Sequence, residues 1–160
     1  MAKVYLGLGS NIGNCERTIR AAFAELSTFL MDARLSRLWC SQALYIEDQP
    51  DFINAVAGGD CELSPRLLLT TINAIEQIFG RDRHSERKKG PRSLDIDILL
   101  YGSLILTEPD LIIPHTGLKE RQFALLPLLD LDSGLRDPVS GEFYKAICEE
   151  LPRQGIYLLE

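Results

Sequence analysis

Residues 94–102 read LDIDILLYG, in which acidic and apolar residues alternate before three further apolar residues and a glycine. Successive side chains of a strand point to opposite faces, so the alternation places Asp95 and Asp97 on one face and the isoleucines on the other. The Cα atoms of the two aspartates would then lie roughly 7 Å apart. We therefore predict a strand over residues 94–101 that carries a pair of carboxylates and ends at Gly102.

The first part of the chain predicts a strand followed by a helix. Residues 4–8 are apolar and strand-like, and the turn-forming cluster at residues 9–14 ends this strand. Asn14 is suited to cap a helix, because apolar residues then recur at helical spacing as far as Leu30.

Two extended segments and a second helix lie between this helix and the acidic strand. Residues 35–45 and 52–63 read as strands separated by a polar break. Ser64 is suited to cap a helix that starts with Pro65 and stops at Gly80. The order β-α-β-β-α-β predicts an α+β fold, a ferredoxin-like sandwich in which helices pack on an antiparallel sheet.

The remaining residues predict a C-terminal extension. We expect a short strand and loop over residues 103–114 and helices over residues 118–129 and 143–151. A chain of 160 residues fits one domain, so residues 1–160 are expected to fold as a single unit.

The composition argues against several classes of protein. The chain is 46% hydrophobic and 25% charged, and its formal net charge is −6. Binding to nucleic acid or to an anionic membrane through charge requires a basic surface, so neither partner is expected. The first residues lack the features of a signal peptide, and no run approaches the roughly 20 apolar residues of a membrane span. Four widely spaced cysteines indicate reduced thiols in a cytoplasmic protein, and we expect a monomer.

The two aspartates are candidates for a metal site. Like charges at neighbouring positions of a sheet repel each other, and Mg²⁺ offsets such repulsion while completing its shell with water and phosphate oxygens. A half-exposed strand with a polar outer face explains the same alternation, and that alternative stays open if the alternation is taken alone.

The segment just before the acidic strand is strongly basic. Six basic side chains fall within twelve residues of an acidic protein: Arg81, Arg83, Arg87, Lys88, Lys89 and Arg92. Arginine forks bind phosphate oxygens and lysines act as point charges, so this cluster beside the carboxylates suggests a triphosphate held with its metal. A solvated loop paired with Asp82 and Glu86 is the alternative for the basic cluster by itself.

Three glycines near the N-terminus are weaker evidence for a ligand site. Gly7, Gly9 and Gly13 follow a strand and precede a helix, but their spacing is one residue too long for a dinucleotide-binding fingerprint. They either make the turn or let the backbone approach a ligand.

The segment KKGPRSLDIDIL at residues 88–99 resembles the signature of the 6-hydroxymethyl-7,8-dihydropterin pyrophosphokinases of folate biosynthesis. The similarity extends over essentially the whole chain, with supporting segments GLGSN at residues 7–11, DQPDFIN at 48–54, GRDR at 80–83 and PH at 114–115. The resemblance implies a ferredoxin-like fold and transfer of diphosphate from ATP to the pterin hydroxymethyl group, with release of AMP.

The same resemblance implies roles for individual residues. Asp95 and Asp97 would hold two Mg²⁺ ions that bridge the phosphates of ATP, the co-substrate. The catalytic residues would be Arg81, Arg92, Asp95 and Asp97. The nucleotide would be contacted by Glu76, Arg83, Arg92, Ile98, His115, Thr116 and Arg121. The pterin would lie between Phe52 and Phe123, with further contacts from Ser41, Gln42, Leu44, Asn54 and Asp95.

Some positions depart from the usual family pattern. Lys89 replaces the tryptophan that commonly precedes Gly-Pro-Arg, Thr116 stands where tyrosine is common, and residues 41–45 lack the usual Thr-Pro and glycine. The resemblance also implies that residues 41–48 and 82–89 move as lids. Two other functions stay open: a non-catalytic ferredoxin-like module that senses a nucleotide, and a two-metal phosphohydrolase or nuclease.

Overall fold

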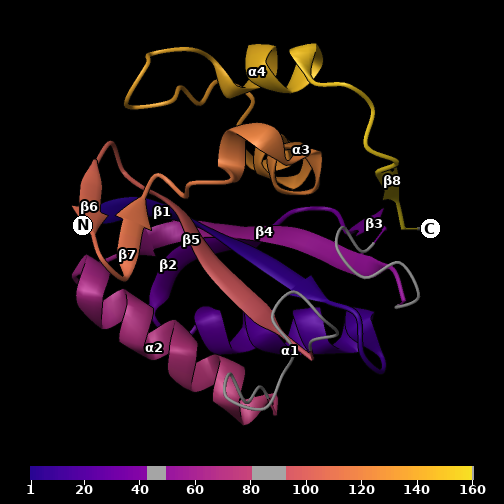
Figure 1. Cartoon of the computed structure of the whole chain (residues 1–160). Coiled ribbons are helices and arrows are strands. Elements are labelled where there is room, and N and C mark those ends of the chain that lie inside the picture. The colour runs from indigo at the N-terminus through magenta and orange to yellow at the C-terminus, as the bar shows by residue number, and fades with distance from the viewer. Residues whose placement is uncertain (43–49, 81–92, 160) are drawn as a thin grey trace.

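A computed structural model describes residues 1–42, 50–80 and 93–159 of the chain. Within these residues, six strands form one antiparallel sheet in the order β5-β1-β4-β3-β8, with β2 also paired to β4. The strands are β1 (Ala2–Ser10), β2 (Leu30–Leu35), β3 (Trp39–Ser41), β4 (Phe52–Cys61), β5 (Asp95–Tyr101) and β8 (Tyr157–Leu158). The acidic strand β5 therefore lies at one edge of the sheet, next to β1 (Figure 1).

Two helices cover one face of this sheet. Figure 1 shows α1 (Cys15–Leu26) and α2 (Pro65–Ile78) side by side on that face. Their apolar residues pack against β1, β4 and β5 in a core that includes Leu6, Ile19, Ile72 and Ile96. The predicted caps are present, because Asn14 accepts from the Arg17 N–H and Ser64 accepts from the Leu67 N–H.

The other face carries the C-terminal extension, as the upper half of Figure 1 shows. The short 3₁₀ helix η1 (Leu118–Glu120) leads into α3 (Gln122–Leu131), which packs over β4, and α4 (Tyr144–Glu150) packs on α3. This second core includes Tyr5, Val56, Leu125 and Tyr144. A separate hairpin of β6 (Leu106–Glu108) and β7 (Leu111–Ile113) lies beside β5.

An irregularity in β5 decides which side chains face α3. Tyr5 pairs with Leu100 but Leu6 pairs with Ile98, so Leu99 is the extra residue of a β-bulge. Before the bulge, Ile96 and Ile98 belong to the core under α1 and α2. Asp95 and Asp97 therefore point to the opposite face, which is the face of α3.

The α+β class, the antiparallel sheet and the two main helices agree with the sequence prediction, but several bounds were wrong. The first helix ends at Leu26, and Leu30 instead starts β2, whose pairing with β4 shifts near Asp32, a residue with φ of 52°. Strand β1 continues to Ser10, so Gly9 lies within a strand and not in the turn.

The later segments also differ in detail. In the described part of the extended segment predicted at residues 35–45, residues 35–42, the strands are the end of β2 and the short β3. The helix predicted at residues 118–129 is divided into η1 and α3, and residues 103–114 form the β6–β7 hairpin. Strand β8 was not predicted. Phe79 caps α2 and Gly80 follows with φ of 84°, as the glycine stop required.

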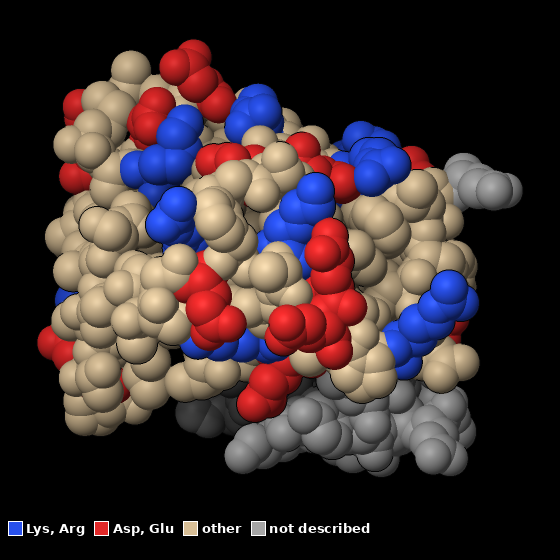
Figure 2. All heavy atoms as spheres, turned by 90° about the horizontal axis from the view of Figure 1, so that it is seen from above, with Lys and Arg blue, Asp and Glu red and all other residues tan. Residues whose placement is uncertain are grey.

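Charges on the face with α3 and α4 are mixed. Figure 2 views this face and shows basic and acidic side chains interspersed over it. Two of the pairs are Arg37 with Asp130 at 2.7 Å and Lys119 with Asp137 at 2.6 Å. No helix in the described part of the chain is long and apolar enough to span a bilayer.

Candidate active site

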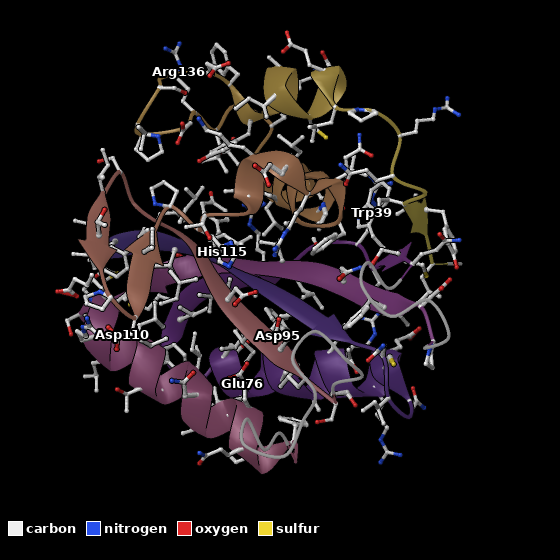
Figure 3. All side chains as sticks on the ribbon, viewed as in Figure 1. Trp39, Glu76, Asp95, Asp110, His115 and Arg136 are labelled. Carbon is white, nitrogen blue, oxygen red and sulfur yellow. The ribbon has the colours of Figure 1, made fainter. Side chains whose placement is uncertain are left out.

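The carboxylate pair lies on β5 opposite two glycines. In the β1–β5 ladder, Asp95 pairs with Gly9 and Asp97 pairs with Gly7. Both aspartates are half-buried. Because the two partners are glycines, β1 places no side chain beside the carboxylates. The Leu99 side chain covers Gly7, with Cδ2 3.4 Å from the position of a Cβ atom there, so the flat part of the sheet surface is at Gly9. In Figure 3, Asp95 lies near the start of β5, below His115 in the view.

The flat surface at Gly9 extends toward β4. It pairs with Asp95 on one side and with Asn54 on the other, so the three residues form one row across the sheet. A Cβ atom at Gly9 would lie 3.5 Å from Asn54 Oδ1 and 3.8 Å from Phe52 Cδ1. A planar ring can therefore rest on Gly9 between the carboxylates and the Asn54 amide, with the Phe52 ring beside it.

Asn54 is held in place by its own neighbours. It is buried, and its Nδ2 donates to Ser41 Oγ at 2.7 Å and toward the Trp39 carbonyl at 3.4 Å. With the amide nitrogen engaged in this way, Oδ1 is the atom that faces Gly9. Ser41, predicted to contact the pterin, thus acts on Asn54, while Gln42 next to it is exposed.

His115 lies close to the carboxylate pair. Its backbone N–H donates to the Leu99 carbonyl at 3.0 Å, and its Nε2 lies 3.8 Å from Asp97 Oδ1. Nδ1 accepts from the Gly117 N–H at 3.1 Å, so the neutral ring carries its proton on Nε2, facing Asp97. Burial, and then the positive charge of Arg121, lowers the pKa of His115, while Asp95 opposes the shift. These effects favour a neutral imidazole.

Arg121 and Phe123 form the wall contributed by the start of α3. The Arg121 guanidinium lies so close over Gly117 that a Cβ atom there would be 2.6 Å from Nε. Its Cζ also lies 5.7 Å from the centre of the Phe123 ring. This cation–π contact sets the guanidinium beside the ring predicted to stack on the pterin. Thr116, in the same turn, is exposed.

Two residues predicted to contact the nucleotide have buried side chains. Glu76 is 1% exposed, and its Oε2 accepts from the Ile96 N–H at 2.8 Å. This bond shows that the Ile96 N–H points away from β1, and by strand periodicity the Ile98 N–H does the same. The Ile98 side chain lies in the core, so a contact from this residue to a nucleotide would run through its backbone at the open edge of β5.

The donor set suits a hard cation such as Mg²⁺. Two carboxylates face the same side of an edge strand, and carboxylate oxygens are the ligands that Mg²⁺ prefers. Within residues 1–42, 50–80 and 93–159, no group of three or more His, Cys, Asp and Glu side chains is placed to hold a metal. Mg²⁺ held by one or two carboxylates commonly completes its shell with water and substrate phosphates.

Several predicted residues lie outside the described ranges. These are Leu44, Arg81, Arg83 and Arg92, together with Arg87, Lys88 and Lys89 of the basic cluster. Most of both segments expected to act as lids also falls there. Gly9 was not among the predicted site residues. One of the two interpretations of the three N-terminal glycines was, however, that they let the backbone approach a ligand.

Comparison with known proteins agrees with the sequence resemblance. Residues 5–133 match the model of the 7,8-dihydro-6-hydroxymethylpterin-pyrophosphokinase family. The chain is 40% identical over 157 residues to a 2-amino-4-hydroxy-6-hydroxymethyldihydropteridine pyrophosphokinase of Pseudomonas aeruginosa, a match that covers 96% of this chain and 94% of that protein. It is 41% identical over 139 residues to the folic acid synthesis protein fol1 of Pneumocystis carinii, covering 86% of this chain.

The chain spans only 18% of that fungal protein, whereas it spans nearly the whole of the Pseudomonas protein. Among solved structures, a Plasmodium falciparum HPPK-DHPS chain superposes with a TM-score of 0.75 at 15% identity, covering 93% of this chain and 45% of that one. That likeness supports the fold. The sequence matches over most of its length show that this chain belongs to the 7,8-dihydro-6-hydroxymethylpterin-pyrophosphokinase family.

Proposed function

We propose that this chain transfers the diphosphate group of ATP to the hydroxymethyl oxygen of 6-hydroxymethyl-7,8-dihydropterin and releases AMP, as a step of folate biosynthesis. The observation that carries the proposal is the row Asp95–Gly9–Asn54 across the sheet. In this row a carboxylate, a glycine and a side-chain amide lie side by side, in a chain that belongs to this family.

The pterin would lie flat on Gly9. Asn54 Oδ1 would accept hydrogen bonds from N–H groups at the edge of the heterocycle, because its amide nitrogen is engaged by Ser41. Phe52 and Phe123 would supply the two aromatic faces. In this pose the hydroxymethyl group is directed toward Asp95, at the other end of the row.

The carboxylate pair would hold Mg²⁺, and we propose two ions in the complex with ATP. Bound there, the ions would neutralise the phosphate charge and stabilise both the entering and the departing oxygen. Asp95 and Asp97 contribute negative charge on one face of a strand that Glu76 holds from the other side. The part of β5 that carries the two carboxylates is therefore held in place by a bond within the protein.

Basic side chains would orient the triphosphate for in-line attack. The pterin hydroxymethyl oxygen loses its proton to water and forms a bond to the β-phosphorus, the bond from that phosphorus to the α,β-bridging oxygen breaks, and AMP carries that oxygen away. Arg121 stands beside Phe123, and neutral His115 can donate from Nε2. We assign Arg81, Arg83 and Arg92 to the phosphates by the family resemblance, and the backbone of Ile98 and Thr116 to the nucleoside.

The wider assignments belong to the same proposal. Residues 1–160 would act as one pterin pyrophosphokinase domain, as a cytoplasmic monomer whose partners are ATP and the pterin, with no nucleic acid or membrane partner. The family match over residues 5–133 and the two cores on the faces of a single sheet support the single-domain assignment.

Product analysis tests the proposed reaction. The protein is incubated with ATP, Mg²⁺ and 6-hydroxymethyl-7,8-dihydropterin, and products are separated and weighed by mass spectrometry. We expect equal amounts of AMP and diphosphorylated pterin, and no AMP when the pterin is omitted. ATP binding without turnover would instead indicate a nucleotide-sensing module, and phosphate release without pterin would indicate a phosphohydrolase.

A further inference from the structure

The last residues of the chain contact both walls of the proposed pterin site. One wall is the start of α3 with Phe123, and the other is strands β3 and β4 with Phe52. We call residues 154–159 the C-terminal strap. At its start, Gln154 and Gln122 exchange hydrogen bonds: the Gln122 N–H donates to Gln154 Oε1 at 2.9 Å, and the Gln154 N–H donates to Gln122 Oε1 at 3.2 Å. Gln154 Nε2 also donates to the Glu120 carbonyl at 2.9 Å. These bonds fix the start of α3, between Arg121 and Phe123.

The end of the strap is bound to the opposite wall. In β8, Tyr157 pairs with Cys40 and Leu158 pairs with Trp39 on β3. The Leu159 N–H donates to the Leu38 carbonyl at 3.0 Å. Strand β3 in turn pairs Ser41 with Phe52. The strap therefore completes the sheet next to the residues that hold Asn54 and Phe52.

Tyr157 adds a side-chain contact to β4. Its hydroxyl donates to Asp51 Oδ2 at 3.1 Å, and Asp51 is the residue just before Phe52. This bond, more than its other contacts, raises the pKa of Tyr157, so the hydroxyl stays protonated and able to donate at neutral pH. Because Tyr157 pairs with Cys40, its side chain lies on the sheet face opposite to Ser41 and Asn54. Tyr157 thus bonds to β4 on the face of the sheet opposite to the proposed pterin site.

The length of the strap limits how far apart the two walls can be. Two residues separate Gln154 from Tyr157, and the three peptide units that join them span at most roughly 10 Å. A ring held between Phe52 and Phe123 needs carbon contacts of roughly 3.5–4 Å on each side. A change of about 1 Å in the separation of the walls would therefore weaken binding.

We propose that the C-terminal strap is a positioning element for the pterin, in which Gln154 and Tyr157 fix the spacing between Phe123 on α3 and Phe52 on β4. This inference rests on the proposed function, since it concerns the same site. It assigns a role in substrate affinity to residues that do not contact the substrate. The strap should affect the pterin more than ATP, because among the described residues with a proposed nucleotide contact, Arg121 is the one next to a residue that the strap bonds.

Two conservative changes test the strap. Tyr157→Phe removes only the hydroxyl that bonds Asp51, and Gln154→Ala removes the side-chain bonds to Gln122 and Glu120. Pterin dissociation constants are measured by calorimetry with Mg²⁺ and a non-hydrolysable ATP analogue present. We expect each variant to raise this constant about threefold to tenfold, because binding must then restore the spacing of the two walls that the lost bonds had fixed. The dissociation constant of the ATP analogue should stay as in the wild type, while the urea midpoint should fall slightly, since each variant loses one or two hydrogen bonds of the folded state.

Arg153→Ala is the matched control, because Arg153 is an exposed side chain on the residue before the strap. It should bind pterin like the wild type. A coupling test is also available: since Tyr157 and Asp51 share one bond, Asp51→Ala combined with Tyr157→Phe should weaken pterin binding no more than the stronger single change.

The outcomes separate the strap from the proposed function. If the wild type binds pterin and both strap variants bind it equally well, or lose ATP affinity to the same extent, the strap proposal is wrong while the function stands. If the wild type binds no pterin, the proposed function fails. Amide exchange then decides the strap: faster exchange at residues 39–41 and 52–54 in Tyr157→Phe supports it, and unchanged exchange overturns it.

Discussion

Glu76 Oε2 accepts a 2.8 Å hydrogen bond from the backbone N–H of Ile96, the residue between the two aspartates of β5. Strand β5 lies at the edge of the sheet, so its outward N–H groups have no neighbouring strand to bond. Glu76 supplies that partner from α2, on the face opposite to Asp95 and Asp97. The buried Glu76 carboxylate therefore fixes the part of β5 that carries Asp95 and Asp97, although it lies on the other face of the sheet.

Loss of this bond should destabilise the fold. Glu76→Ala leaves a buried backbone N–H without its acceptor, and we expect the free energy of unfolding to fall by about 1–3 kcal/mol. Urea denaturation measures the change, and Gln77→Ala, at an exposed neighbour on the same helix, is the control. Glu76→Gln keeps an acceptor oxygen and should lose less. Equal stability of Glu76→Ala and Gln77→Ala would show that the bond contributes nothing.

Gly9 should be required for pterin binding and not for folding. The Cβ atom of Gly9→Ala meets Asn54 Oδ1 and Phe52 Cδ1 at 3.5 and 3.8 Å, which are ordinary contacts, so the fold accepts it. The methyl group would occupy the surface on which the ring rests, and we expect pterin affinity to fall about tenfold, the cost of a modest overpacking. Calorimetric titration with pterin measures this loss.

Gly58→Ala is the contrasting variant on the same face of the sheet. Its Cβ atom would lie 3.1 Å from both Leu131 Cδ1 and Tyr5 Cε1, so these two core side chains must shift to accept it. That change should lower the urea midpoint. A Gly9→Ala protein that binds pterin like the wild type would remove Gly9 from the proposed site.

Asp137 should make the stability of the protein depend on acid pH. Its carboxylate is 2% exposed and accepts from Lys119, Ser140 and Tyr144. Burial acts to raise its pKa, but the hydrogen bonds outweigh it and bring the pKa to about 2, from an ordinary value of 3.8. The folded state therefore binds this proton less readily than the unfolded state, and the stabilisation is present above pH 3.8 and lost as the pH falls toward 2.

Asp137→Asn tests this account. At pH 7 the variant should be less stable by on the order of 2 kcal/mol. The difference from the wild type should shrink as urea denaturation is repeated at pH values from 5 down to 2.5. Glu149→Gln, at an exposed position, should follow the wild type at every pH. A gap between Asp137→Asn and the wild type that stays constant with pH would contradict the assignment.

Much of the fold could be predicted because its signals are local. The cap at Ser64, Pro65 at the helix start and Gly80 after its end fix α2 within a few residues. Leu30 was assigned to the first helix because it continues the spacing of Leu26, and periodicity cannot tell that the chain has already turned into β2. Strand β8 has two residues and exists only through pairing with β3, a long-range contact with no local signal.

The candidate site also has a part that local sequence predicts and a part that depends on long-range pairing. Alternation within residues 94–98 was enough to predict that Asp95 and Asp97 share a face, which is where the structure has them. The row from Asp95 through Gly9 to Asn54 could not be predicted, because it depends on the register of three strands that are far apart in sequence. The bond from Glu76 to Ile96 likewise joins residues on different elements. The family resemblance was the basis for assigning roles to these residues, and those roles remain proposals.

Asp97→Asn tests the catalytic assignment of the carboxylate pair. The side chain is 40% exposed, so the variant should fold with an unchanged urea midpoint. Loss of one metal ligand should lower the rate of AMP formation about 100-fold or more, since a bound cation supplies several kcal/mol of charge stabilisation. Asp110→Asn, an exposed aspartate bonded to Arg66, is the control and should keep the wild-type rate.

The most direct measurement counts the cations at this pair. Mn²⁺ is titrated into the wild type and into Asp97→Asn in the presence of a non-hydrolysable ATP analogue, and bound metal is followed by electron paramagnetic resonance. We predict two bound Mn²⁺ ions per wild-type chain and the loss of at least one in Asp97→Asn. The same Mn²⁺ stoichiometry and affinity in both proteins would contradict the claim that the carboxylates of β5 hold the metal with ATP.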